Sequence, residues 1–144
     1  PRRGRRRGAR PDGPVMDALS TGFCGTFAAL SVVYVWLSFR VILLRRRHKV
    51  GVGDGGHKDL ARAIRVHGNF AEWVPMALIG LLAADLRGVS DSIIAVLGAV
   101  LVLARVAHAE GLTRTAGSSS FRTFGVAGTI CVLVFAALGA VLAG

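Results

Sequence analysis

The stretch RAIRVHGNFAEWVPMALIGLLAA, residues 62–84, decides how this sequence folds. Its first part carries two arginines, a histidine, an asparagine and a glutamate, and its second part is apolar. The apolar part alone is too short for a membrane helix, which needs about 20 residues to cross the hydrocarbon. Extended through the polar part, to residues 60–84, the segment is long enough. The sequence therefore predicts a membrane helix that carries polar side chains into the bilayer.

Three other segments are also long and apolar. The chain has 144 residues, 53% of them hydrophobic, and its mean hydropathy of +0.57 is far above that of an ordinary soluble domain. Residues 18–39 and 123–144 carry no charge, and residues 89–112 reach membrane length when their polar end is included. The short connection DLRGVS requires the second and third segments to form an antiparallel hairpin. We predict an all-α membrane protein, a bundle of four transmembrane helices.

The first fifteen residues differ from the rest, because six of the first ten are arginine. One interpretation is a basic tail that binds anionic lipid or nucleic acid. The favoured interpretation is a non-native extension before a natural start at Met16. The membrane domain then comprises residues 16–144, and nucleic acid is not expected as its partner.

The two cysteines, Cys24 and Cys131, stand alone in apolar segments. Neither belongs to a CxxC or metal-spaced motif, so we expect no disulfide framework and no metal site. Thiols in such surroundings usually act as small apolar side chains. We expect both cysteines to be buried.

The distribution of basic residues predicts the orientation in the membrane. Connections that are rich in lysine and arginine remain in the cytoplasm. The first connection is the most basic, the third has two arginines at its edges, and the second has only Arg87. We predict that connections one and three face the cytoplasm and that both termini face away from it, in what we expect to be a bacterial inner membrane.

The polar residues of the helices should meet at one level of the membrane. On a helical wheel, four polar residues of the second helix fall within an arc of about 80°. Arg105, His108 and Leu112 share a face of the third helix, which runs antiparallel to the second. A charge that faces lipid costs several kcal/mol, so these faces should point into the bundle or a wet cavity. The second-helix set is Arg62, Arg65, Asn69 and Glu72.

The ends of the other two helices add arginines at the same level. Arg122 begins the fourth helix, and Arg40 and Arg45 end the first. Arg40 and Arg45 could either point inward or extend to the membrane surface. Against these cations stands one carboxylate, Glu72, which we expect to pair with Arg65 or Arg105.

The excess of positive charge indicates the chemistry of a ligand. Arginine side chains bind carboxylates bidentately, so a small molecule with two or more carboxylates would suit the site. The alternative is that the same residues only join the helices through buried ion pairs. Spacing alone leaves both interpretations open.

Two segments resemble known motifs. RAIRVHGNFAEWVP is similar to the second-helix signature of the membrane-associated proteins in eicosanoid and glutathione metabolism, the MAPEG family, with an arginine pair followed by N-x-x-E-x-x-P at Asn69, Glu72 and Pro75. GAVLVLARVAHAEGL resembles the third helix of that family, with Arg105 and His108 at R-x-x-H spacing. The segment HGNFAE is typical of the small bacterial branch of the family.

The resemblance implies a homotrimer of four-helix bundles that holds glutathione between neighbouring subunits. Arg65, Asn69 and Glu72 would contact the peptide, with Glu72 at its amino end. Arg105 and His108 would contribute from the third helix. Arg62 would lie beside them as a further cation of the site. Arg122 would lie at the glutathione sulfur and favour its thiolate form. Arg45 would reach in from the adjacent subunit.

The resemblance also implies an activity, with one departure. A membrane glutathione S-transferase or peroxidase would bring glutathione to a lipophilic small molecule dissolved in membrane lipid. Synthases of the family carry a tyrosine where this chain has Leu112, and Tyr34 in the first helix is the only tyrosine. We therefore expect slow turnover. The alternatives are a small proton-coupled multidrug-type exporter using Glu72, or a structural membrane subunit without a ligand.

Overall fold

The computed structural model describes residues 19–115, 117 and 119–143. It consists of four helices in this part of the chain: α1 (Thr21–His48), α2 (Lys58–Leu86), α3 (Asp91–Arg114) and α4 (Ser120–Leu142). All four are long and apolar enough to cross a membrane. The predicted all-α membrane bundle is confirmed, whereas the extension at residues 1–15 lies outside the described residues.

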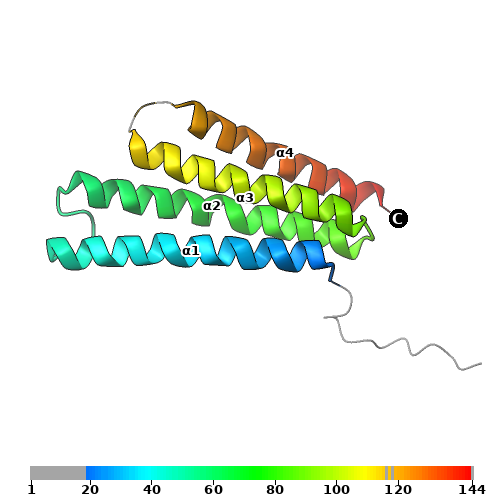
Figure 1. Cartoon of the computed structure of the whole chain (residues 1–144), viewed down its shortest axis with the longest axis horizontal. Helices are drawn as coiled ribbons and strands as arrows, with labels where there is room; N and C mark the ends of the chain where they lie inside the picture. Colours follow the sequence, from blue (N-terminus) through cyan, green and yellow to red (C-terminus); the bar gives the residue numbers. More distant parts are fainter. Residues whose placement is uncertain (1–18, 116, 118, 144) are drawn as a thin grey trace, which may run out of the picture.

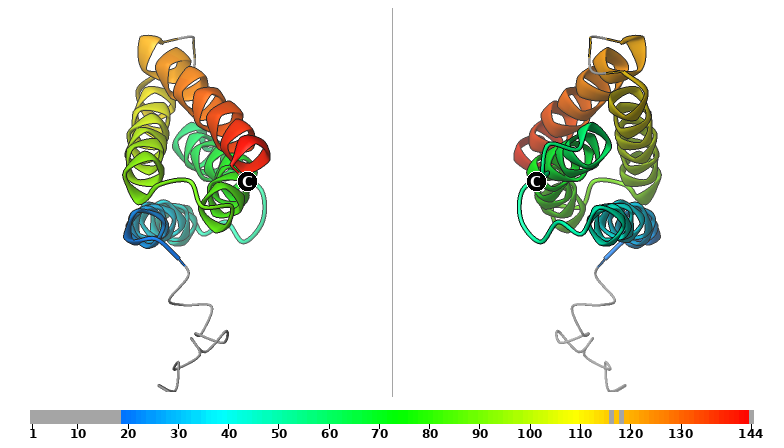
Figure 2. Two further views of the ribbon diagram at one scale, coloured as in Figure 1. Left: turned by 90° about the vertical axis from the view of Figure 1, so that its right-hand side faces the viewer. Right: turned by 90° about the vertical axis from the view of Figure 1, so that its left-hand side faces the viewer.

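The helices form an up-and-down bundle (Figure 1). α2 and α3 pack against each other and against both outer helices, and α1 and α4 lie on opposite sides of the bundle (Figure 2). The turn between Leu86 and Asp91 confirms the predicted hairpin. The described chain therefore begins and ends at the same end of the bundle (Figure 1).

α1 is longer than its uncharged segment suggested. It continues through three arginines to His48 and ends at Lys49, whose left-handed conformation (φ 56°) lets its N–H donate to the carbonyls of Arg45 and Arg46. Arginine is a good helix former, and cations are favourable in the last turn of a helix. Only residues 49–57 form the connection, where several glycines have positive φ.

Small residues allow the helices to approach closely. A Cβ at Gly98 of α3 would overlap the Thr26 hydroxyl of α1, and a Cβ at Gly125 of α4 would lie 2.5 Å from His108 Cβ of α3. Such contacts are typical of membrane bundles, in which helices associate through close packing. The approach at Gly125 sets α4 directly beside the polar part of α3.

The outer surface of the bundle is apolar, as expected for a chain surrounded by lipid. Exposed side chains include Val32, Phe39 and Leu103. Cys24 and Cys131 are also exposed, so the prediction that they are buried is wrong. An apolar segment in a membrane protein has two apolar environments, the core and the lipid, and composition does not distinguish them.

Candidate functional site

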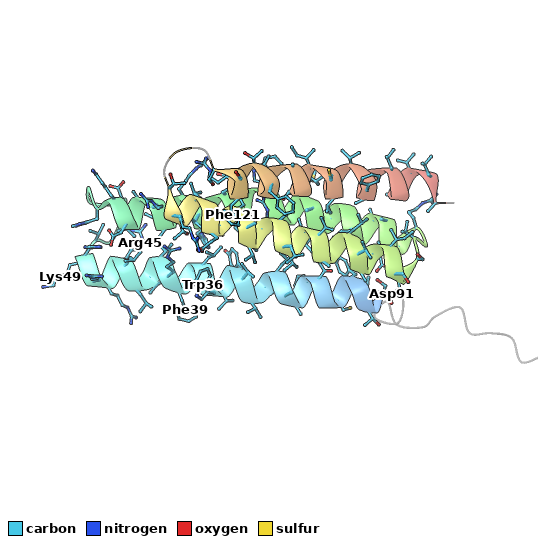
Figure 3. The ribbon with its side chains drawn as sticks, turned by 45° about the horizontal axis from the view of Figure 1, so that its top comes forward. Trp36, Phe39, Arg45, Lys49, Asp91 and Phe121 are labelled. Carbon is cyan, nitrogen blue, oxygen red and sulfur yellow. The ribbon has the colours of Figure 1, made fainter. Side chains whose placement is uncertain are left out.

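The polar side chains gather at the end of the bundle where α1 and α3 end and α2 and α4 begin. Figure 3 shows Arg45 and Lys49 at this end and Asp91 at the other. The sequence-based prediction that the polar residues share one level is confirmed by the helix order. The individual side chains differ in burial and in the partners that they contact.

Arg105 lies in the centre of this region and is 2% exposed. Its Nη1 donates to Asn69 Oδ1 of α2 at 3.2 Å, and its Nη2 donates to the Gly125 carbonyl of α4 at 2.8 Å. The Arg105 guanidinium thus joins α3 to α2 and α4. Its role as a ligand contact stays a prediction.

His108 follows one turn later on α3 and is 6% exposed. Its Nδ1 is buried and has no hydrogen-bond partner among the described residues. A buried polar atom without a partner is costly, so such atoms often mark the position of a ligand or water. Gly125 permits this packing, because any side chain there would meet His108.

A cavity of about 620 Å³ opens between α2, α3 and α4. It brings together five of the predicted site residues, from three helices: Arg62, Arg65, Asn69, His108 and Arg122. The remaining lining residues are Lys58, Ala61, Trp73, Leu112 and Val126. We call this space the cationic cavity.

Arg62 is fixed by α3, because its Nη1 donates to the Thr113 carbonyl at 2.9 Å. Arg40 of α1 approaches the same residue, and its Nη1 donates to Thr113 Oγ1 at 2.8 Å. Of the two alternatives for Arg40, the structure selects the inward one. The end of α3 is therefore held by one arginine from α1 and one from α2.

Arg65 and Glu72 form the expected ion pair, with Arg65 Nη1 3.5 Å from Glu72 Oε1. The two side chains are 66% and 55% exposed, so neither is buried inside the single bundle, although Arg65 lines the cationic cavity as the prediction of a wet cavity allows. The helical wheel gives relative directions around α2 but does not identify which neighbour covers each. Glu72 does not line the cationic cavity.

Arg45 lies outside the cationic cavity. Its Nη1 donates to the Gly51 and Gly53 carbonyls at 3.1 and 2.9 Å, which closes the connection after α1. In a single chain Arg45 thus stabilises a loop. The contact with a neighbouring subunit implied by the resemblance stays a prediction.

Arg122 lies in the first turn of α4 and lines the cationic cavity. Its backbone N–H donates to the Ser119 cap at 3.3 Å, and its Nη1 donates to the Gly117 carbonyl at 2.5 Å. The N-terminus of a helix carries partial positive charge, which adds to that of the guanidinium. This end of the cavity is therefore suited to an anion.

The sequence analysis did not include Lys58, at the end of the basic first connection, among the site residues. The signal was present, since Lys58, Arg62, Arg65 and Asn69 follow the i, i+4, i+7, i+11 spacing of one helix face. With Lys58 the cavity lining has four cations and no carboxylate. The geometry therefore favours a ligand with more than one negative charge.

The comparisons agree with this architecture. The family model of the MAPEG family matches residues 23–142. Two relatives, each described as "Inner membrane protein YecN", come from Escherichia coli strain K12 and Escherichia coli O6:H1. Each is 33% identical over 113 residues, which cover 78% of this chain and 85% of the relative.

Proposed function

Because the chain belongs to the MAPEG family, we propose that it is an integral membrane protein that binds glutathione and acts on lipophilic electrophiles as a glutathione S-transferase or peroxidase. The observation that carries this proposal is the cationic cavity, which gathers polar residues of α2, α3 and α4 in about 620 Å³. Glutathione has two carboxylates, and guanidinium groups bind carboxylates through paired hydrogen bonds. Arg62 and Arg65 are the residues we assign to them.

Arg122 is the residue we assign to the sulfur. A guanidinium and a helix N-terminus both lower the pKa of a nearby thiol, which raises the fraction of the reactive thiolate. Thiolate attack on an electrophilic carbon forms a carbon–sulfur bond and expels a leaving group with its electron pair. His108 lines the same cavity as Arg122, which supports a polar ligand there.

We further propose a homotrimer with glutathione at the interfaces. Arg65 and Glu72 support it, because they lie more than half exposed in the polar half of a membrane helix, where lipid is a poor environment for charges. A neighbouring copy would cover them. Native mass spectrometry from mild detergent should give trimers, and only monomers or dimers would contradict the proposal.

Isothermal titration of the detergent-solubilised protein with glutathione tests the ligand. The unaltered protein should bind, and Arg65→Ala should weaken binding about tenfold to a hundredfold, because a charge-assisted hydrogen bond contributes roughly 1.5 to 3 kcal/mol. Arg47→Ala is the matched control, since Arg47 is exposed in the last turn of α1 and lies outside the cavity lining. It should bind as the unaltered protein does.

A structural membrane subunit is the second candidate, and the contacts of Arg105 favour it. This arginine joins three helices, as a residue kept for stability alone would. The structural interpretation requires that no heat of glutathione binding is found while the oligomer persists. A pH-driven transport signal without glutathione binding would instead support the exporter.

A further inference from the structure

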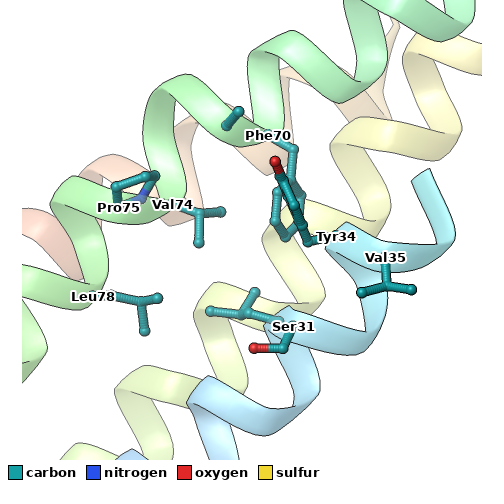
Figure 4. A pocket seen from close by; sticks show the side chains of 9 residues that line it. Ser31, Tyr34, Val35, Phe70, Val74, Pro75 and Leu78 are labelled. Carbon is teal, nitrogen blue, oxygen red and sulfur yellow. The ribbon is translucent and has the colours of Figure 1, made fainter. Parts of the chain in front are cut away.

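A second cavity, of about 550 Å³, lies between α1 and α2 (Figure 4). It shares no lining residue with the cationic cavity. Its walls are mainly apolar, and no charged side chain contributes to them. The lining residues are Leu30, Ser31, Tyr34, Val35, Phe70, Ala71, Val74, Pro75 and Leu78. We call this space the α1–α2 groove.

The groove contains one hydroxyl donor without a partner. The Tyr34 hydroxyl makes no hydrogen bond within the described part of the chain, although Tyr34 is held by ring contacts with His67 at 5.0 Å and Phe70 at 6.2 Å between centroids. Ser31 differs, because its hydroxyl already donates to the Phe27 carbonyl at 2.8 Å. Tyr34 therefore offers the groove a positioned donor.

The groove also contains a carbonyl that its helix leaves unpaired. Pro75 lies inside α2 and has no N–H, so the Ala71 carbonyl lacks its usual donor four residues later. Both Ala71 and Pro75 line the groove. The proline thus leaves an acceptor without its helical donor in the part of α2 that lines the groove.

Both groups lie within the hydrocarbon level of the membrane. Tyr34 is six residues before Arg40, the first charged residue of α1, which corresponds to about 9 Å along a helix. Lipid tails provide no hydrogen bonds at that depth, and membrane tyrosines are usually found at the interfaces instead. A ligand that satisfies both groups must carry its own polar atom into the bilayer.

We propose that the α1–α2 groove binds a neutral lipophilic alcohol from the bilayer. A single hydroxyl group can accept from Tyr34 and donate to the Ala71 carbonyl, whereas a ketone or ether can only accept. The hydrocarbon part of the ligand lies against Leu30, Val74 and Leu78. An anionic lipid is not favoured, because no cation lines the groove. This inference does not depend on glutathione binding.

Photolabelling with two probes tests the inference: a hexadecanol that carries a diazirine, and the corresponding alkane without the hydroxyl group. In the purified protein in nanodiscs, the alcohol should label the groove segments of α1 and α2, and unlabelled hexadecanol should compete. Tyr34→Phe keeps the shape of the groove and removes the donor. It should reduce alcohol labelling about fivefold, the value of roughly one hydrogen bond, and leave alkane labelling unchanged.

Two further variants complete the design. Pro75→Ala restores an N–H to the Ala71 carbonyl and should also reduce alcohol labelling. Ser92→Ala is the matched control, because it removes an exposed hydroxyl in the first turn of α3 that does not line the groove. It should have no effect. If Pro75→Ala does not fold, the labelling of Tyr34→Phe alone decides whether the groove binds an alcohol.

Equal labelling by the alcohol and the alkane, or alcohol labelling that Tyr34→Phe leaves unchanged, would overturn the inference and identify the groove as a nonspecific lipid contact. Glutathione titration of Tyr34→Phe separates the two proposals. Its isotherm should match that of the unaltered protein, since Tyr34 lies outside the cationic cavity.

Discussion

The Arg105 guanidinium holds the Asn69 amide, with the donating Nη1 3.2 Å from Asn69 Oδ1. Its other terminal nitrogen donates to the Gly125 carbonyl at 2.8 Å. One buried side chain therefore fixes the relative positions of the three helices that form the cationic cavity. The stability of the bundle and the geometry of the cavity depend on the same residue.

Arg105→Ala should lower the free energy of unfolding by about 2 kcal/mol, because Asn69 loses its donor and the Gly125 carbonyl loses the guanidinium and keeps its bond from the Thr129 hydroxyl. Arg105→Lys should not restore it, since an ammonium cannot reach both acceptors with the planar geometry of a guanidinium. Reversible unfolding in detergent measures the change. The control is Arg114→Ala, which removes the ion pair between Arg114 and Glu110. Arg114 is 67% exposed, so this substitution should change the free energy of unfolding little. Equal effects at both positions would contradict this role of Arg105.

Gly125→Ala should lower the melting temperature and weaken glutathione binding together. The new Cβ would lie 2.5 Å from His108 Cβ and 2.6 Å from the Ala104 carbonyl, so α4 must move away from α3. Gly25→Ala is the matched control, since nothing lies within 4 Å of a Cβ there. The higher helix propensity of alanine should leave that variant as stable or slightly more stable. Identical melting curves for the two variants would show that the close approach at Gly125 is not needed.

The sequence could predict the helices because each apolar segment is long enough to span a membrane, and the short DLRGVS connection dictates the hairpin. It could also predict that Arg105, His108 and Leu112 are buried together, since their i, i+3, i+7 spacing places them on one face of α3.

The exposure of Arg65 and Glu72 could not be predicted from spacing. Periodicity states which residues share a face, whereas exposure depends on which helix covers that face. The same holds for Cys24 and Cys131, whose apolar surroundings are compatible with both core and lipid. The hydrogen bond from Arg105 to the Gly125 carbonyl could not be predicted either, because the pattern of side chains carries no information about which backbone carbonyl accepts a bond.

Arg122→Ala should reduce a glutathione-dependent activity more than it reduces glutathione affinity. The proposed partner of Arg122 is the sulfur, whose charge changes with ionisation, so the loss affects reactivity. Arg65→Ala should instead lower affinity and activity alike, because the carboxylates of glutathione stay charged throughout the reaction. Titration calorimetry and steady-state kinetics on both variants give the comparison. Equal losses of binding and activity in Arg122→Ala would exclude the assignment to the thiolate.

Leu112→Tyr should raise the activity of the protein. Leu112 lines the cationic cavity beside His108 and Arg122, and a phenolic hydroxyl there would add a donor for the thiolate. Turnover with an electrophilic aromatic halide measures the gain, and Leu112→Phe is the control for side-chain size. If Leu112→Phe gives the same increase, the hydroxyl is not responsible.

Gly51→Cys should be labelled by a membrane-impermeant maleimide only from the cytoplasmic side, because the basic connection after α1 is expected to remain there. Gly51 is exposed and has open space for a side chain, so the substitution should be tolerated. Ser90→Cys, in the opposite turn, should be labelled only from the outside. Both variants need Cys24 and Cys131 replaced by alanine. Labelling of position 51 from the outside would contradict the predicted topology.

A structure of the protein determined at saturating glutathione tests the central claim most directly. The account predicts density for the tripeptide in the cationic cavity, with its carboxylates at Arg62 and Arg65 and its sulfur at Arg122. An empty cationic cavity under conditions that saturate a binding isotherm, or glutathione bound at another position, would contradict it.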